Sequence, residues 1–240
     1  MYLLLLAVIY IAFISLGLPD SLLGSAWPTI RAAFDVPLSY MGFVSMIISG
    51  GTIISGLMSE RLTKWLGTKV VTTVSVLLTA VALFGFSTVS GFYQLCLWGI
   101  PYGLGAGAID AIPYGLGAGA VDAALNNYVA LHYSSRHMSW LHCFWGVGTI
   151  VSPYIMSMAL NYSTWSDGYR WVSFIQFGIV LILVFSLPLW KINDKKTEVS
   201  GKESKPLIGI RGALKIRGVP FLLTGFFAYC AAEATAMLWA

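Results

Sequence analysis

Charged residues are scarce in this sequence of 240 residues. Asp, Glu, Lys and Arg together make up 10% of it, whereas 58% is hydrophobic. A soluble domain carries roughly a quarter charged residues, so a chain this apolar cannot cover itself with polar surface. Its apolar residues also gather into runs of about twenty, the length at which a helix crosses a hydrocarbon core of roughly 30 Å. The scarcity of charge therefore argues against a soluble domain and predicts a polytopic protein in a lipid bilayer.

Cysteine and histidine are scarce as well. The three cysteines, Cys96, Cys143 and Cys230, are odd in number and lie within apolar runs, which supports neither a disulfide framework nor a zinc site. His132 and His137 are five residues apart, a poor spacing for one helix face. No nucleophile and base converge, and no basic face suits nucleic acid. We therefore expect no enzyme, no metal, no cofactor and no nucleic-acid partner.

Seven apolar runs are candidates for membrane-spanning segments. They comprise residues 1–24, 38–58, 70–89, 92–131, 138–160, 171–190 and 219–240. None alternates polar and apolar residues as a strand would, so helices are expected rather than a barrel. We expect the first run to be retained rather than cleaved as a signal peptide, because no basic segment precedes it.

Basic residues fall almost entirely on one side of these runs. Of the 14 Lys and Arg residues, all but Arg31 and Arg170 lie in the connections after the second, fourth and sixth runs. Such residues are retained in the cytoplasm. The bias predicts a cytoplasmic N-terminus and cytoplasmic even-numbered connections, in what we expect to be a bacterial plasma membrane.

One polar, Lys-rich stretch, residues 191–218, follows the sixth run. It divides the chain into an N-terminal six-helix transmembrane bundle at residues 1–190, a cytoplasmic linker and a further helix at residues 219–240. A solvated linker is the expected role of these lysines, although binding to anionic lipid is the alternative.

A twelve-residue segment occurs twice in tandem. Residues 100–111 read IPYGLGAGAIDA and residues 112–123 read IPYGLGAGAVDA, so they differ only at Ile109 and Val121. Twelve helical residues add about 18 Å, which makes the fourth run far longer than a bilayer needs. One copy must therefore protrude, tilt or unwind. We expect the second copy to occupy the native place, because it continues directly into residues 124–127.

Four carboxylates lie inside apolar runs: Asp20, Asp110, Asp122 and Glu233. A carboxylate in a membrane span is expensive and indicates function by default. A low-dielectric surrounding favours the neutral acid, so such a group can exchange a proton near neutral pH. In a proton-coupled carrier, protonation and solute occupancy jointly bias the direction in which the site faces. The structural alternative is a carboxylate that is hydrogen-bonded to a neighbouring helix or lies near the interface.

Polar and aromatic residues accompany these acids. Asn126 follows Asp122 by one helical turn, and Trp140, His142 and Trp145 lie in the fifth run. Aromatic faces combined with an amide and a carboxylate suit a sugar or another small polar solute. Each residue alone is also explained by a structural role. Tryptophan is common in membrane proteins, and a lone histidine often forms a hydrogen bond to a neighbouring helix.

The connection after the second run resembles a signature of the major facilitator superfamily. Gly56, Glu60, Arg61, Gly67 and Lys69 are similar to its pattern Gly-x-x-x-Asp-Arg-x-Gly-x-Arg/Lys. Glutamate replaces aspartate, and about one extra helical turn precedes the second glycine. The resemblance therefore implies the superfamily's gating motif only in part.

The end of the fourth run resembles the fucose permease-like branch of that superfamily. In GAGAVDAALN, residues 117–126, Asp122 is followed four residues later by Asn126, whereas Asp110 is followed by Tyr114. In the branch, this carboxylate belongs to the proton-coupled sugar site, which implies that role for Asp122. Residues 141–153 are similar to the fifth helix and residues 229–233 to the seventh. Asp20 matches the first-helix acid loosely.

The resemblance implies twelve helices in two six-helix bundles with the solute bound between them. On that reading the chain is an incomplete fragment, the N-terminal bundle plus a seventh helix, and its partner is a missing C-terminal half or a second copy. The leading hypothesis is a secondary active transporter for proton-coupled uptake of a sugar or similar solute. The alternative is a non-transporting membrane sensor or scaffold built on half a carrier fold.

Overall fold

A computed structural model describes residues 2–66, 68–108, 129, 135–199 and 215–239, and every regular element within them is a helix. The helices are, in chain order, α1 (Tyr2–Asp20), α2 (Leu22–Phe34), α3 (Tyr40–Leu66), α4 (Thr68–Phe86), α5 (Phe92–Ala108), α7 (Ser135–Tyr162), α8 (Trp165–Val199) and α10 (Val219–Trp239). The predicted all-α fold class is confirmed.

Five stretches of the described helices are long and apolar enough to cross a membrane. They are Leu4–Phe34, Lys69–Phe86, Arg136–Tyr162, Trp165–Leu189 and Val219–Ala236. These five correspond to the first, third, fifth, sixth and seventh predicted runs. The second run corresponds to α3, whose apolar stretch Tyr40–Ser55 is shorter. The fourth corresponds to α5, which is described as far as Ala108.

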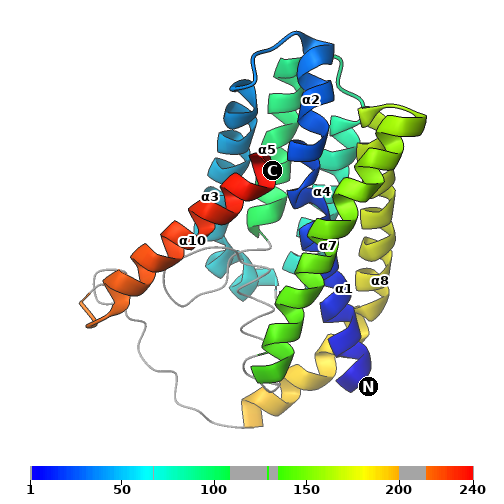
Figure 1. Ribbon diagram of the computed structural model, residues 1–240. Helices are drawn as coiled ribbons and strands as arrows, with labels where there is room; N and C mark the ends of the chain where they lie inside the picture. The colour runs from blue at the N-terminus through cyan, green and yellow to red at the C-terminus, as the bar shows by residue number, and fades with distance from the viewer. Residues whose placement is uncertain (1, 67, 109–128, 130–134, 200–214, 240) are drawn as a thin grey trace.

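Helix α2 continues α1 in the same direction, and this pair lies side by side with the helices from α3 to α8, which run alternately in opposite directions (Figure 1). The N-terminus lies toward one end of the bundle, whereas the α2–α3, α4–α5 and α7–α8 connections lie at the other. Helix α1 packs on α7, α3 packs on α5, and α4 packs on both α5 and α8. Helix α10 crosses in front of the bundle and contacts α2.

The first span is longer than the sequence indicated. It runs over 31 residues, Leu4–Phe34, and is interrupted only at Ser21, between α1 and α2. We expected it to end at residue 24. The buried face of α2 instead continues the span, through Leu22, Leu23, Ala26, Trp27 and Ile30. A straight helix of this length is about 46 Å long, so it crosses the hydrocarbon core with residues to spare.

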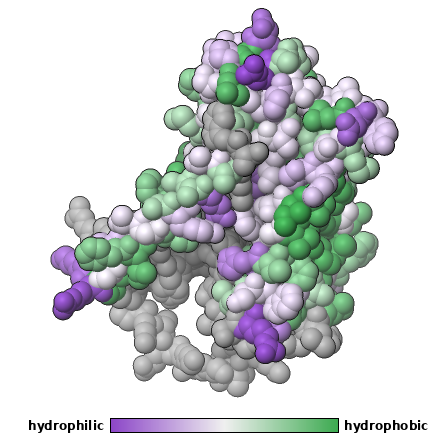
Figure 2. Space-filling view, viewed as in Figure 1, coloured by the Kyte–Doolittle hydropathy of each residue, from purple (hydrophilic) through white to green (hydrophobic). Residues whose placement is uncertain are grey.

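The bundle is apolar inside and outside. Its largest fully buried side chains include Trp27, Phe13 and Phe86, whereas Met46 and Phe185 are 72% and 80% exposed on the outer surface. Figure 2 shows an apolar surface over the middle of α7 and α8 and hydrophilic side chains toward the ends of the bundle. Large exposed apolar surfaces of this kind need cover, and the acyl chains of a bilayer provide it.

The first copy of the tandem repeat packs inside the bundle. Tyr102 is buried, and Gly103 lies so close to α3 that a Cβ there would collide with the carbonyl oxygen of Ile48. A Cβ on Gly105 would lie 2.8 Å from the hydroxyl of Thr79 in α4. The first copy thus continues α5 as far as Ala108, and our expectation that the second copy takes the native place stays a prediction. The second copy, residues 112–123, lies outside the described residues.

Candidate functional site

Asp20 lies close to the middle of the first span, at the break between α1 and α2. It is the last residue of α1 and follows Pro19. A proline inside a helix removes one backbone donor and disturbs the preceding turn. In membrane transporters, such interrupted helices at the middle of the bilayer line solute and ion sites. The local sequence Leu-Pro-Asp-Ser therefore places a carboxylate at an interruption of this kind.

Gln176 of α8 supports the helix at this break. Pro19 cannot donate a backbone hydrogen bond to the carbonyl of Ser15, four residues earlier. The side-chain Nε2 of Gln176 donates to that carbonyl at 2.6 Å, and the Ser15 hydroxyl donates back to Gln176 Oε1. Both side chains are buried. An unsatisfied polar group in lipid costs roughly several kcal/mol, so Gln176 stabilises the turn of α1 that precedes Asp20.

Trp145 of α7 binds Asp20 directly. Its indole Nε1 donates a hydrogen bond to Asp20 Oδ2 at 2.9 Å. The two helices are close enough for this because they cross at glycines. A Cβ on Gly17 would collide with the carbonyl oxygen of Trp145, and a Cβ on Gly148 would collide with that of Ile14. Small residues at such crossings are typical of membrane helices.

Glu233 of α10 lies near the same carboxylate. The two acids interact electrostatically, although 213 positions of sequence separate them. Glu233 also accepts a hydrogen bond from the Tyr229 hydroxyl, one turn earlier, at 3.3 Å. The structure thus brings together two of the predicted site residues, Asp20 and Glu233, one from the bundle and one from the helix that crosses it.

Two buried tyrosines extend this polar group into the bundle. Tyr102 of α5 interacts electrostatically with Asp20 and with Tyr169 of α8. The ring of Phe86 packs against both, with centroids 5.9 Å from Tyr102 and 5.4 Å from Tyr169. Among the described residues the Tyr169 hydroxyl has no hydrogen-bond partner. A buried hydroxyl of this kind is available to a water or a solute.

Trp140 and His142 lie elsewhere on α7. Trp140 is 50% exposed and packs toward Phe144, and His142 is exposed with its ring edge toward Phe13. In the contacts of the described residues, neither side chain hydrogen-bonds to Asp20. Of the three candidates on α7, Trp145 is therefore the one that hydrogen-bonds to Asp20 in the described structure.

The remaining predicted residues are placed only in part. Gly56, Glu60 and Arg61 belong to the second half of α3, and Lys69 begins the apolar stretch of α4. The gating role implied for them stays a prediction. The other predicted positions, Gly67, Asp110, Asp122 and Asn126, lie outside the described residues.

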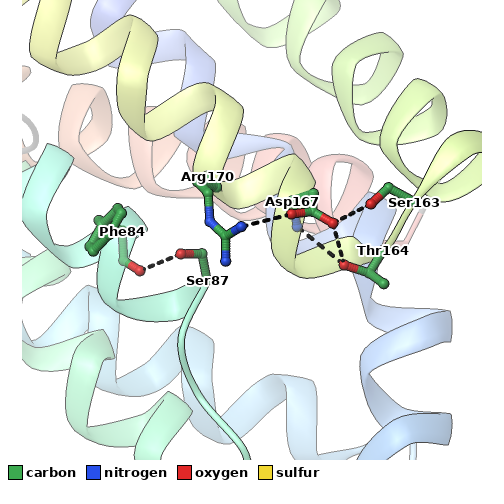
Figure 3. A network of polar contacts seen from close by, with 6 residues as sticks. All are labelled: Phe84, Ser87, Ser163, Thr164, Asp167 and Arg170. Carbon is green, nitrogen blue, oxygen red and sulfur yellow. Dashed lines mark hydrogen bonds and ion pairs between the residues drawn. The ribbon is translucent and has the colours of Figure 1, made fainter.

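A separate polar network caps the start of α8 (Figure 3). The Asp167 carboxylate accepts hydrogen bonds from the hydroxyls of Ser163 and Thr164, the latter at 2.8 Å, and Arg170 pairs with it at 3.0 Å. Acidic and hydroxyl side chains at a helix N-terminus satisfy its free N–H groups. This network fixes the α7–α8 connection and lies apart from Asp20. It explains Asp167 as a structural residue.

In the described part of the chain, no three His, Cys, Asp or Glu side chains come together as a metal site. The residues near Asp20 are carboxylates, phenols and an indole, which suit a proton and a hydroxylated solute rather than a cofactor. What the arrangement can do chemically is bind a proton at a carboxylate inside the membrane and present hydrogen-bonding groups beside it.

The family model of the Major Facilitator Superfamily matches residues 9–240. The chain belongs to the major facilitator superfamily. It is therefore a membrane transporter protein of that superfamily. A comparison with functionally curated proteins gave no match.

Six-helix halves of this superfamily consist of two inverted three-helix repeats. The helices from α1 to α8 fit that plan, counting α1 and α2 as the first. The first helix then packs on the fifth, α7, through Gly17 and Gly148. The fourth helix, α5, packs on the second, α3, through Gly103 and Gly51. Asp20 and Tyr102 thus lie on helices that correspond between the two repeats.

Sequence reasoning missed Gln176, Tyr102 and Tyr169. Gln176 carried a usable signal, because an uncharged amide inside an apolar run must find a hydrogen-bond partner. Tyr102 lies within the repeat, where its neighbours drew the interpretation toward helix contacts. Tyr169 stands at the start of a span, where tyrosine is common as an interfacial anchor.

Proposed function

We propose that this chain is part of a secondary active transporter that takes up a sugar or a similar polar solute together with a proton. The observation that supports this most is the position of Asp20: a carboxylate at a helix break in the middle of a span, bonded to Trp145 and near Glu233. A carboxylate in such a place is costly unless it has a function.

Asp20 is the group that we propose to bind the coupling proton. Protonation removes its charge, which changes its interaction with Glu233 on α10 and so biases how that helix sits against the bundle. Tyr102 and Tyr169 supply hydroxyl groups that suit a polyhydroxylated solute. Asp122 and Asn126 join this site through their resemblance to the fucose permease-like branch, and that assignment is part of the proposal.

We also propose that the N-terminus lies in the cytoplasm of a bacterial cell. The distribution of Lys and Arg supports this orientation. The arrangement of the helices agrees with it, since Arg31 and Arg170 lie near the end of the bundle opposite to the N-terminus. Labelling of single cysteines placed at Arg31 and at Arg217 with a membrane-impermeant reagent tests it, because only the first should react in intact cells.

Isothermal titration calorimetry of the purified chain in detergent micelles tests the function. Neutral hexoses, pentoses and deoxyhexoses are titrated one at a time between about pH 5 and pH 9, the range in which a carboxylate in a membrane can change its charge. If one proton binds with the solute, the dissociation constant rises up to about tenfold per pH unit above the titrating pH. Binding that is independent of pH, or no binding of any sugar, would contradict the proposal.

A further inference from the structure

The hydrogen bond between Trp145 and Asp20 joins two groups that cannot move apart easily. Gly17 and Asp20 are one turn apart on α1, and both face Trp145: Gly17 contacts its backbone and Asp20 its indole. On α7, Gly148 lies one turn from Trp145 and contacts the backbone of α1. The indole is therefore anchored at the carboxylate by the backbone contact on either side of it.

This hydrogen bond depends on the charge of the carboxylate. An indole N–H can donate a hydrogen bond but cannot accept one, so it cannot pair with the O–H group of a protonated acid. Hydrogen bonds to an ionised acceptor are roughly twice as strong as those between neutral groups. The bond between Trp145 and Asp20 therefore holds the ionised form of Asp20 more firmly than the protonated form.

Other groups near Asp20 act on the same charge. Among the described residues, Glu233 of α10 and Tyr102 of α5 interact with it electrostatically, and Tyr169 of α8 interacts with Tyr102. The polar groups that α8 contributes beside the break, chiefly the amide of Gln176, are neutral. A charged Glu233 repels a charged Asp20. The hydrogen bond from the Trp145 indole has the opposite effect, because it stabilises the charge on Asp20.

We infer that Trp145 is a positioning residue that sets the pH at which Asp20 takes up its proton. The inference rests on the proposed function, in which Asp20 carries the coupling proton. Trp145 performs this role without touching the proton itself: it orients the carboxylate and stabilises its charged form. Removal of the indole N–H, with the ring kept, should let Asp20 bind a proton at higher pH.

Infrared titration of the whole chain in lipid nanodiscs tests this inference. The absorption of protonated carboxylic acids is followed against pH, and the band that Asp20→Asn removes is assigned to Asp20. In Trp145→Phe, the pH of half-protonation of that band should rise by about one unit, as expected when a hydrogen bond to a charged group is lost. A second variant carries a tryptophan analogue with sulfur in place of the indole N–H at position 145. It keeps the shape and should show the same rise even if Trp145→Phe folds poorly.

Trp27→Phe is the matched control. The Trp27 indole is buried and donates to the carbonyl oxygen of Leu38 at 3.2 Å, so this variant loses the same kind of bond away from Asp20. It should lower the melting temperature and leave the Asp20 band unmoved. If the band is present but neither variant at position 145 shifts it, the inference is wrong. If Asp20→Asn removes no titrating band at all, the proposed function fails at its first step.

Discussion

The side-chain Nε2 of Gln176 donates to the backbone carbonyl oxygen of Ser15 across 2.6 Å and 161 positions of sequence. This carbonyl is the one that Pro19 leaves without a helical partner. One side-chain amide from α8 thus replaces the backbone hydrogen bond that is missing just before Asp20. This contact therefore stabilises the bundle and also supports the segment that carries Asp20.

Gln176→Leu should destabilise the chain by about 2 to 4 kcal/mol, because it removes two hydrogen bonds and leaves the Ser15 carbonyl buried and unpaired. Thermal unfolding in detergent, followed by circular dichroism, measures the loss. Ser173→Ala is the control, since it removes one hydrogen bond between α8 and the Ala80 carbonyl and strands no carbonyl at a proline. Equal losses in the two variants would show that Gln176 has no special role at the break.

Gly148→Ala should separate α1 from α7. The added methyl group meets the backbone of Ile14 and Leu18, and overpacking of this kind costs about 1 to 3 kcal/mol. Gly146 lies on the same helix with open space where its Cβ would be. Gly146→Ala should therefore leave the melting temperature unchanged or raise it, since alanine favours a helix over glycine. A neutral Gly148→Ala would contradict the close crossing.

Deletion of residues 112–123 should leave the chain folded. The described contacts of the repeat come from its first copy, at Tyr102, Gly103 and Gly105. The deletion also places Asp110 four positions before Asn126, so the carboxylate–amide pattern of the fourth helix is kept. We expect a melting temperature in detergent at least equal to that of the parent. The reciprocal deletion of residues 100–111 yields a chain that differs only by valine in place of Ile109, so its melting temperature should match.

The sequence was enough to predict the fold class and to single out two residues of the candidate site. Asp20 and Glu233 could be found because a charge within an apolar run is rare and costly. Their proximity could not, since it depends on how α10 crosses the bundle. Trp145 was visible as one of three candidates in the fifth run. Which of the three reaches Asp20 depends on the glycine crossing of α1 and α7.

The misplaced end of the first span has a physical cause. The first span extends to Phe34 because α2 is amphipathic and its apolar face stays buried, whereas the sequence interpretation ended it at residue 24. The preferred repeat copy was chosen from the residues that follow it. The structure describes the first copy as part of α5 as far as Ala108, and the choice between the copies stays a prediction because the second copy lies outside the described residues.

The central claim is that Asp20 binds the proton that accompanies the solute. Calorimetry in two buffers of different ionisation enthalpy counts the protons taken up when a sugar binds to the purified chain. The wild type should take up about one proton per solute above the pH at which Asp20 titrates in the free chain, and Asp20→Asn, which cannot bind one there, should take up about none while still binding the sugar. An Asp20→Asn variant that takes up as many protons as the wild type would contradict the account.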